Sequence, residues 1–313
     1  RSGTTWLVQS LNRHPEILAF GETHFFSRRW VAPGPDGTYS PKQVESIWRD
    51  LATCPFWSVV PLRKDLGKKD AGWFSQTCRE DIPEVIETAR NLAGPRPGPA
   101  GILDAIGQAF CAREGKSVWI EKCATEGKCA HKTIAKVPDA RFIVTMRDPV
   151  GFLRSYKFQG SQSGSDSAWR KFFSDRYHPI LGALVWRNTY RSVSKIRARY
   201  PDQVSVHVLC NETNRRAALE SACHHLGVSP DPAIYEQVNK KVNSSAVDNI
   251  EQTLDRQDIA WLRALCTVDD PDLGISEDLP PTGFIDLLKS IPSAIRWALR
   301  FLVKHRPSKH VPR

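Results

Sequence analysis

The first five residues, RSGTT, have the composition of a phosphate-binding turn, and residues 4–12 after it show apolar residues at helical spacing. A helix N-terminus carries unpaired N–H groups and a partial positive charge, so it attracts anions. Gly3 permits close backbone approach, the hydroxyls add donors, and Arg1 offers a rigid fork of N–H groups. Small residues before a helix also act as simple caps. The expected anion-binding residues are Arg1, Ser2, Gly3, Thr4 and Thr5.

A second candidate anion site lies in the middle of the chain. Residues 140–145 are rich in branched residues, which predicts a buried strand. Arg147 follows this strand, and residues 149–158 predict a helix that contains Ser155. An arginine at a strand end and a serine in the next helix can converge on one phosphate. Either residue alone is usually a surface residue, so the pair carries the prediction.

Two other strand ends carry ionisable side chains. The apolar run 17–20 predicts a buried strand that is followed by Glu22, and the strand predicted at 117–120 is followed by Lys122. In open α/β sheets, active groups gather at the carboxyl ends of strands. Taken alone, a glutamate in this position is more often simply solvated.

These motifs, in this order and spacing, resemble the sulfotransferases that use 3'-phosphoadenosine 5'-phosphosulfate (PAPS). Residues 1–5 are similar to the family's 5'-phosphosulfate loop, and Arg147 with Ser155 is similar to its 3'-phosphate motif. The resemblance extends to about residue 245. It implies a P-loop-like α/β fold, PAPS as the donor, its bisphosphate product (PAP) as a ligand, a hydroxyl-bearing acceptor and no required metal.

Several details resemble particular branches of the family. Residues 14–16 and 21–23 are similar to Golgi protein-tyrosine sulfotransferases, whereas 22–26 are similar to heparan sulfate sulfotransferases. The cytosolic branch uses a histidine two places after a lysine, and here the residue two places after Lys122 is Ala124. This departure argues against the enzymes that act on small phenols and steroids.

The resemblance implies a mechanism in which Glu22 is the general base. Sulfuryl transfer needs a base for the acceptor proton and cations for the charge that develops on the sulfuryl and leaving oxygens. Arg1 and Lys122 are the expected cations. Many members have lysine at the place of Arg1, and because a guanidinium stays charged, Arg1 is expected to act electrostatically.

For several other residues the sequence is consistent with two roles. Lys240 and Lys241 resemble a late basic loop that closes over the nucleotide's 3'-phosphate, but a solvated lysine pair has the same appearance. Trp6 is expected in the core, with packing near the adenosine as the alternative. His24 suits either an acceptor contact or a structural hydrogen bond.

The alternation of strands and helices predicts a central parallel sheet flanked by helices. We expect one sulfotransferase domain at 1–270, with a variable acceptor-side insert at 32–115 and a tail at 271–313. The family's first strand is expected to be missing ahead of Arg1. Further predicted elements are helices at 43–51, 83–93 and 179–200 and a strand at 204–209.

The composition favours anionic partners but does not identify one. The 313 residues carry a formal net charge of +10, which favours anionic partners, but no nucleic-acid-binding motif is present. No apolar run reaches the roughly 18 residues of a membrane span. The basic amphipathic segment at 292–306 predicts a helix that either packs on the domain or makes peripheral membrane contact.

The resemblance leaves the location of the protein and the identity of its acceptor open. A bacterial chain would be cytoplasmic, and a eukaryotic one would lie in the Golgi lumen, held by an anchor ahead of Arg1. The acceptor could be a glycan, a tyrosine or a small molecule. Two rival functions remain: a P-loop phosphotransferase, which would normally have a GK[ST] lysine, and an inactive nucleotide- or glycan-binding relative.

Overall fold

The computed structural model describes residues 3–20, 33–53, 82–122, 134, 137, 139–158, 177–209, 212–238, 254–273, 275 and 283–304. Several residues of the predicted site lie outside these ranges: Arg1, Ser2, Glu22, His24, Lys240 and Lys241.

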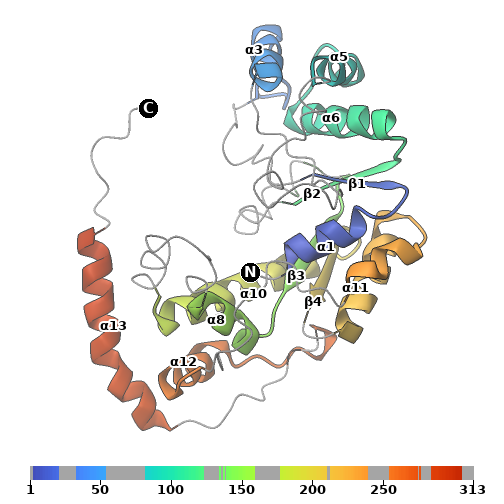
Figure 1. Cartoon of the computed structure of the whole chain (residues 1–313). Helices are drawn as coiled ribbons and strands as arrows, with labels where there is room; N and C mark the ends of the chain where they lie inside the picture. The colour runs from blue at the N-terminus through green and yellow to red at the C-terminus, as the bar shows by residue number, and fades with distance from the viewer. Residues whose placement is uncertain are drawn as a thin grey trace, which may run out of the picture.

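The strands are short and parallel, and they form two pairs. β1 (Ile17–Phe20) pairs with β2 (Val118–Glu121), and β3 (Phe142–Met146) pairs with β4 (Val204–Val208). All four lie within two residues of their predicted bounds. Among the described residues, the pairs are separate two-stranded sheets and not one continuous sheet (Figure 1).

One shared core joins the two pairs. α1 (Thr4–Leu11) and α11 (Glu212–Leu226) pack together, and η2 (Pro232–Gln237) closes the same layer. Apolar side chains from both strand pairs meet these helices: Ile17, Val118, Ile120 and Ile143. The burial of this cluster therefore sets how the carboxyl ends of the two strand pairs lie relative to each other.

A second helical layer surrounds β3 and β4. It consists of α8 (Pro149–Lys157), α10 (Pro179–Arg199) and α12 (Arg256–Cys266), with η3 (Pro271–Leu273) beside β4. Trp186, Leu153 and Leu262 are almost fully buried between them.

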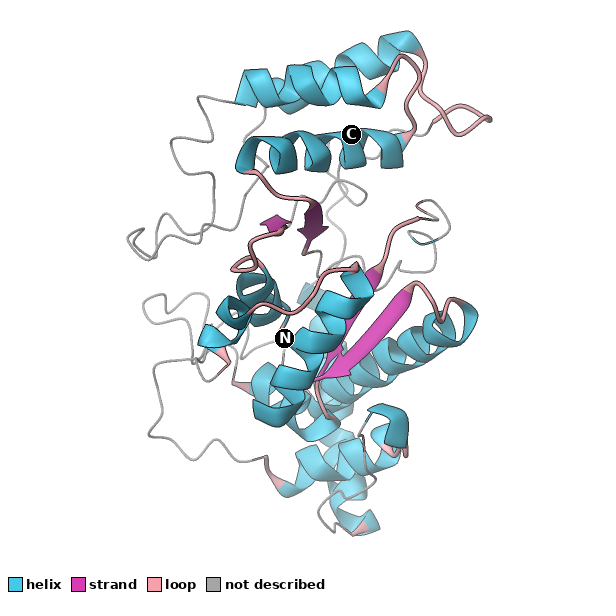
Figure 2. Cartoon of the chain, turned by 90° about the vertical axis from the view of Figure 1, so that its right-hand side faces the viewer, coloured by secondary structure: helices cyan, strands magenta, loops and turns pink. Residues whose placement is uncertain are grey.

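The described part of the predicted insert is a set of helices above β1 and β2 (Figure 2). It contains α3 (Pro41–Thr53), α5 (Ile82–Ala93) and α6 (Pro99–Glu114). Sequence reasoning did not predict α6. Its small and apolar residues surround most of the helix instead of forming one stripe, because it is buried between α5 and the strands.

The C-terminal helix α13 spans Phe284–Lys304, so the prediction of a helix beginning at Pro292 was wrong. Proline usually starts or breaks a helix, since it lacks the N–H that bonds to the carbonyl four residues earlier. Here Pro292 lies inside the helix, and both it and Leu288 are exposed. Water can therefore hydrate the carbonyl of Leu288 that proline leaves without a partner. None of the described helices combines the length and apolarity needed to cross a membrane.

Candidate functional site

The predicted 5'-phosphate turn is built around Gly3. This residue caps α1 with a φ of 84°, in the left-handed region where glycine is favoured, and its carbonyl accepts from the amide of Leu7 at 3.0 Å. No described side chain caps this end of the helix. The first-turn amides, which have no carbonyl partners inside a helix, are thus presented as donors for an anion.

Gly3 also packs tightly against the end of β4. A Cβ atom at this position would lie 2.8 Å from Cδ1 of Leu209, the residue that directly follows the strand. Only glycine allows both this backbone conformation and this close approach. The N-terminus of α1 is therefore seated at the carboxyl end of the β3–β4 pair.

A backbone contact links this turn to the second motif. The amide of Leu209 donates to the carbonyl of Met146 at 3.0 Å, and Arg147 is the next residue. One residue, Leu209, thus contacts both Gly3 and the strand end that carries Arg147. The structure brings together the two motifs, which lie more than 140 residues apart in the sequence.

Arg147 is held by its backbone at the start of α8. Its carbonyl accepts from Nε1 of Trp186 at 2.9 Å, and its side chain is half-buried. Asp148 caps α8 by accepting from the amide of Gly151 at 2.7 Å, and Pro149 occupies the first turn. These contacts fix the point at which the Arg147 side chain leaves the strand.

Ser155 lies on α8, on the same face as the cap residue Asp148, because seven residues are close to two helical turns. The arrangement gives a half-buried serine along the helix that begins beside Arg147. Convergence of the two side chains on one anion remains a prediction.

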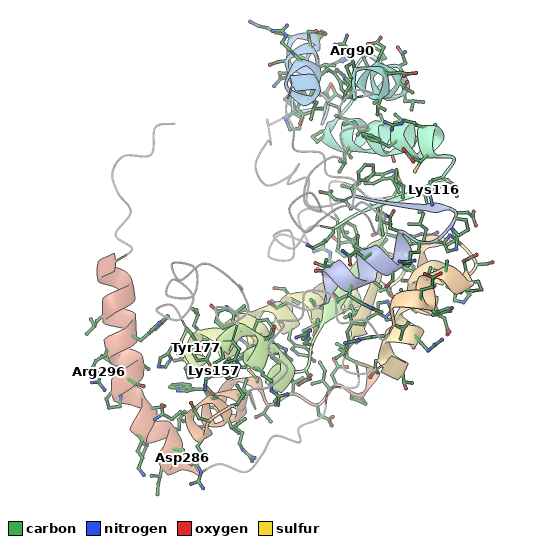
Figure 3. All side chains as sticks on the ribbon, in the orientation of Figure 1. Arg90, Lys116, Lys157, Tyr177, Asp286 and Arg296 are labelled. Atoms are coloured by element: carbon green, nitrogen blue, oxygen red, sulfur yellow. The ribbon has the colours of Figure 1, made fainter. Side chains whose placement is uncertain are left out.

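A buried carboxylate anchors α8 on its other side. Nζ of Lys157 lies 2.5 Å from Oδ2 of Asp258 and 2.9 Å from Oδ2 of Asp255, and the hydroxyl of Tyr177 donates to Asp258 at 2.6 Å (Figure 3). Burial alone would lower the pKa of Lys157, but the hydrogen bonds to both aspartates raise it above its usual value. This cluster ties the helix that carries Ser155 to α12.

Lys122 lies at the carboxyl edge of the other strand pair. Its amide donates to the carbonyl of Phe20 at 3.1 Å, and Phe20 pairs with Glu121. The chain towards Glu22 leaves β1 at this same point. The strand ends therefore bring Lys122 beside the start of the segment that carries the predicted base, while Glu22 itself lies outside the described residues.

Arg215 of α11 contacts α1 in a way that the sequence did not reveal. Its guanidinium lies 5.6 Å from the centroid of the Trp6 ring, and its Nη1 donates to the carbonyl of Val238 at 3.1 Å. Val238 is two residues before Lys240, so this contact attaches the start of the predicted basic loop to α1. Trp6 itself is a core residue, 5% exposed. One arginine in a charged helix gives no sequence signal for such a contact.

Comparison with known proteins identifies the family. A model of the sulfotransferase family matches residues 1–232. The chain belongs to the sulfotransferase family. This confirms both the resemblance and the α/β fold class predicted from the sequence. No curated protein matches the chain.

Two bacterial sulfotransferase structures are similar to this member of the family. The sulfotransferase domain of the olefin synthase from Synechococcus PCC 7002 is 16% identical, with 99% of this chain and 92% of that chain covered and a TM-score of 0.43. The sulfotransferase STF9 from Mycobacterium avium is 10% identical, with 98% and 75% covered and a TM-score of 0.38.

Proposed function

We propose that this sulfotransferase moves a sulfuryl group from PAPS to the hydroxyl of an acceptor. The observation that supports this donor is the contact of Leu209 with both the Gly3 turn and the Arg147 strand end. PAPS carries anionic groups on both the 5' and the 3' side of a single ribose. Two neighbouring motifs of predicted anion-binding residues, on different elements, suit a ligand with two separate anionic groups.

Each motif would hold one end of the donor. The Gly3 turn and the first-turn amides of α1 bind the 5'-phosphosulfate, with hydroxyl donors from Thr4 and Thr5. Arg147 binds the 3'-phosphate through its fork of N–H groups, and Ser155 adds a hydroxyl. The basic loop that carries Lys240 and Lys241 would close over this phosphate. Its start at Val238 is already held near Trp6 by Arg215.

The chemical step is an in-line transfer. The acceptor oxygen bonds to the sulfur as the bond between sulfur and the phosphate oxygen of PAP breaks. Glu22 takes the proton of the acceptor hydroxyl, while Arg1 and Lys122 hold the charge that develops on the sulfuryl and leaving oxygens. The position of Lys122 at the edge from which the Glu22 segment leaves is what supports this division of roles.

The acceptor would be a hydroxyl-bearing molecule with affinity for a basic protein. The net charge of +10 favours an acidic acceptor, such as a glycan that already carries charged groups, over a neutral one. Incubation of the protein with isotopically labelled donor and a panel of glycans, tyrosine peptides and small phenols, followed by mass spectrometry, would identify it.

The donor site is tested by PAP binding to Arg147→Ala, measured by isothermal titration calorimetry. Loss of a charged hydrogen bond costs about 1.5–3 kcal/mol, so the Kd should rise about 10- to 100-fold. Arg154→Ala is the matched control, since Arg154 is an exposed arginine on α8, the helix that follows Arg147. Equal affinity of both variants would contradict the assignment of the 3'-phosphate site.

The base is tested separately with Glu22→Gln. This variant should bind PAP as the wild type does and lose at least about 100-fold in turnover of the acceptor identified by mass spectrometry. Turnover within a few-fold of the wild type would refute the role of Glu22 and leave the donor site untouched.

A further inference from the structure

The helix α13 exposes a continuous apolar stripe. Phe284 is 72% exposed, Leu299 58% and Ile295 55%. Of the eight large apolar side chains that are exposed in the described part of the chain, six lie on this one helix: Phe284, Ile285, Leu288, Ile291, Ile295 and Leu299. Most of them follow one another at intervals of three and four residues, which places them along one helix face. Exposure on this scale marks an interaction surface.

The opposite face of α13 attaches the helix to the domain. Ser290 is fully buried, Oγ of Ser293 lies 3.5 Å from Nε2 of His178, and the ring of Trp297 packs against His178 with 5.4 Å between centroids. α13 also packs on α12, and it forms one margin of the molecule (Figure 1). The apolar stripe therefore belongs to a helix that packs on the domain with one face and exposes the other.

The charge around the stripe is strongly positive. Lys289 and Arg296, the latter labelled in Figure 3, are exposed on α13. From Lys289 to Arg313 the sequence contains seven Lys and Arg residues and no Asp or Glu. In a helical projection, Lys289 and Arg296 fall together on one flank of the apolar stripe, between it and the packed face.

We propose that α13 binds an anionic lipid surface, with the apolar stripe in the headgroup–acyl boundary and the basic side chains against phosphate and carboxylate headgroups. An exposed apolar face bordered by Lys and Arg is the pattern of helices that lie in the membrane interface. Such a helix does not need to be long and apolar enough to cross the bilayer. The proposal is independent of the donor and acceptor of the enzyme.

A second copy of the chain is a less suitable occupant. In an antiparallel two-fold dimer the same flank of both helices lies on one side of the contact, so the basic flank of one α13 would face the basic flank of the other. No acidic residue after Asp286 offsets this repulsion. An anionic lipid surface would both bury the apolar stripe and attract the basic side chains beside it.

The test is co-sedimentation of the full chain with vesicles of phosphatidylcholine alone and of phosphatidylcholine mixed with phosphatidylserine. The wild type should bind the mixed vesicles at least about tenfold more strongly, because each basic residue near the surface adds roughly fivefold in affinity, and added salt should weaken binding. The double variant Ile295→Ser/Leu299→Ser should lose binding to both vesicles. Lys289→Glu/Arg296→Glu should weaken binding to the mixed vesicles and leave binding to phosphatidylcholine alone unchanged.

Leu92→Ser is the matched control, since Leu92 is an exposed leucine on α5, away from α13. It should bind vesicles as the wild type does. Circular dichroism checks that each variant is folded. Unchanged binding of folded Ile295→Ser/Leu299→Ser, or equal binding of the wild type to both vesicles, would overturn the proposal. So would vesicle-free dimerisation, seen by light scattering and lost in the same variant, which would assign the stripe to self-association.

Discussion

Gly3→Ala should damage both stability and donor binding, and the structure separates two causes. Alanine in the left-handed region costs about 1–2 kcal/mol through its Cβ. In addition, the new Cβ would lie 2.8 Å from Cδ1 of Leu209. Overpacking costs about 1–3 kcal/mol, and the low end applies here because the terminal methyl of Leu209 can rotate away. The expected total loss in the free energy of unfolding is about 2–3 kcal/mol.

Gly115→Ala isolates the backbone part of this cost. Gly115 ends α6 with a φ of 64°, and nothing lies within 4 Å of its would-be Cβ. Its expected loss is therefore about 1–2 kcal/mol, with no effect on PAP binding. Leu209→Val removes the clashing methyl, so Gly3→Ala should cost about 1 kcal/mol less in that background than in the wild type.

The assays are urea unfolding and calorimetric titration with PAP. Because alanine disfavours the left-handed conformation of Gly3, the first turn of α1 should shift, and Gly3→Ala should also weaken PAP binding about 10-fold or more, the loss expected for one misplaced charged hydrogen bond. If Gly3→Ala is no more destabilising than Gly115→Ala, or if its affinity for PAP is unchanged, the turn is an ordinary helix cap and our reasoning fails.

Two further predictions concern buried ionisable groups. Lys157→Met leaves the carboxylate of Asp258 buried without its cation, so it should lower the free energy of unfolding, measured in urea, by about 3 kcal/mol. Arg90→Met removes the cation of an exposed pair and should change this free energy by less than about 1 kcal/mol. Equal effects would show that the cluster does not anchor α8. Burial lowers the pKa of His207 to about 4, from roughly 6.5 in the unfolded chain. Between these pH values only the unfolded state takes up the proton, so the stability from this group is complete above about pH 6.5 and is lost, by up to about 3 kcal/mol, as the pH falls towards 4. His207→Gln should flatten this dependence in denaturation curves recorded across that range, and the exposed His224→Gln should not; a curve for His207→Gln that matches the wild type would contradict the burial argument.

The local sequence was enough to predict the elements that depend on short-range preferences. Strand β1 was predicted at its observed bounds, because four consecutive apolar residues before a glycine suit a buried parallel strand. The helix that starts at Pro149 was also predicted, and its observed start has two local causes, Asp148 at the cap and Pro149 in the first turn. The motifs of the proposed donor site were predicted on similar grounds, since an anion-binding turn needs particular residue types within a few positions.

Features that depend on packing could not be read from the chain. Helix α6 has no single apolar stripe, since it is covered on several sides, and α13 runs through Pro292 at a position where Leu288 and Pro292 are exposed. The contact of Arg215 with Trp6 depends on how α11 crosses α1.

The sequence alone predicted which groups bind anions and in what order they occur, because that prediction depends on individual side chains and on glycine's backbone. The tertiary structure decided that the Gly3 turn and the Arg147 strand end meet at Leu209. It also decided that the apolar stripe of α13 faces outward. Both outcomes depend on which surfaces are buried against each other, and that is set by contacts between residues far apart in the chain.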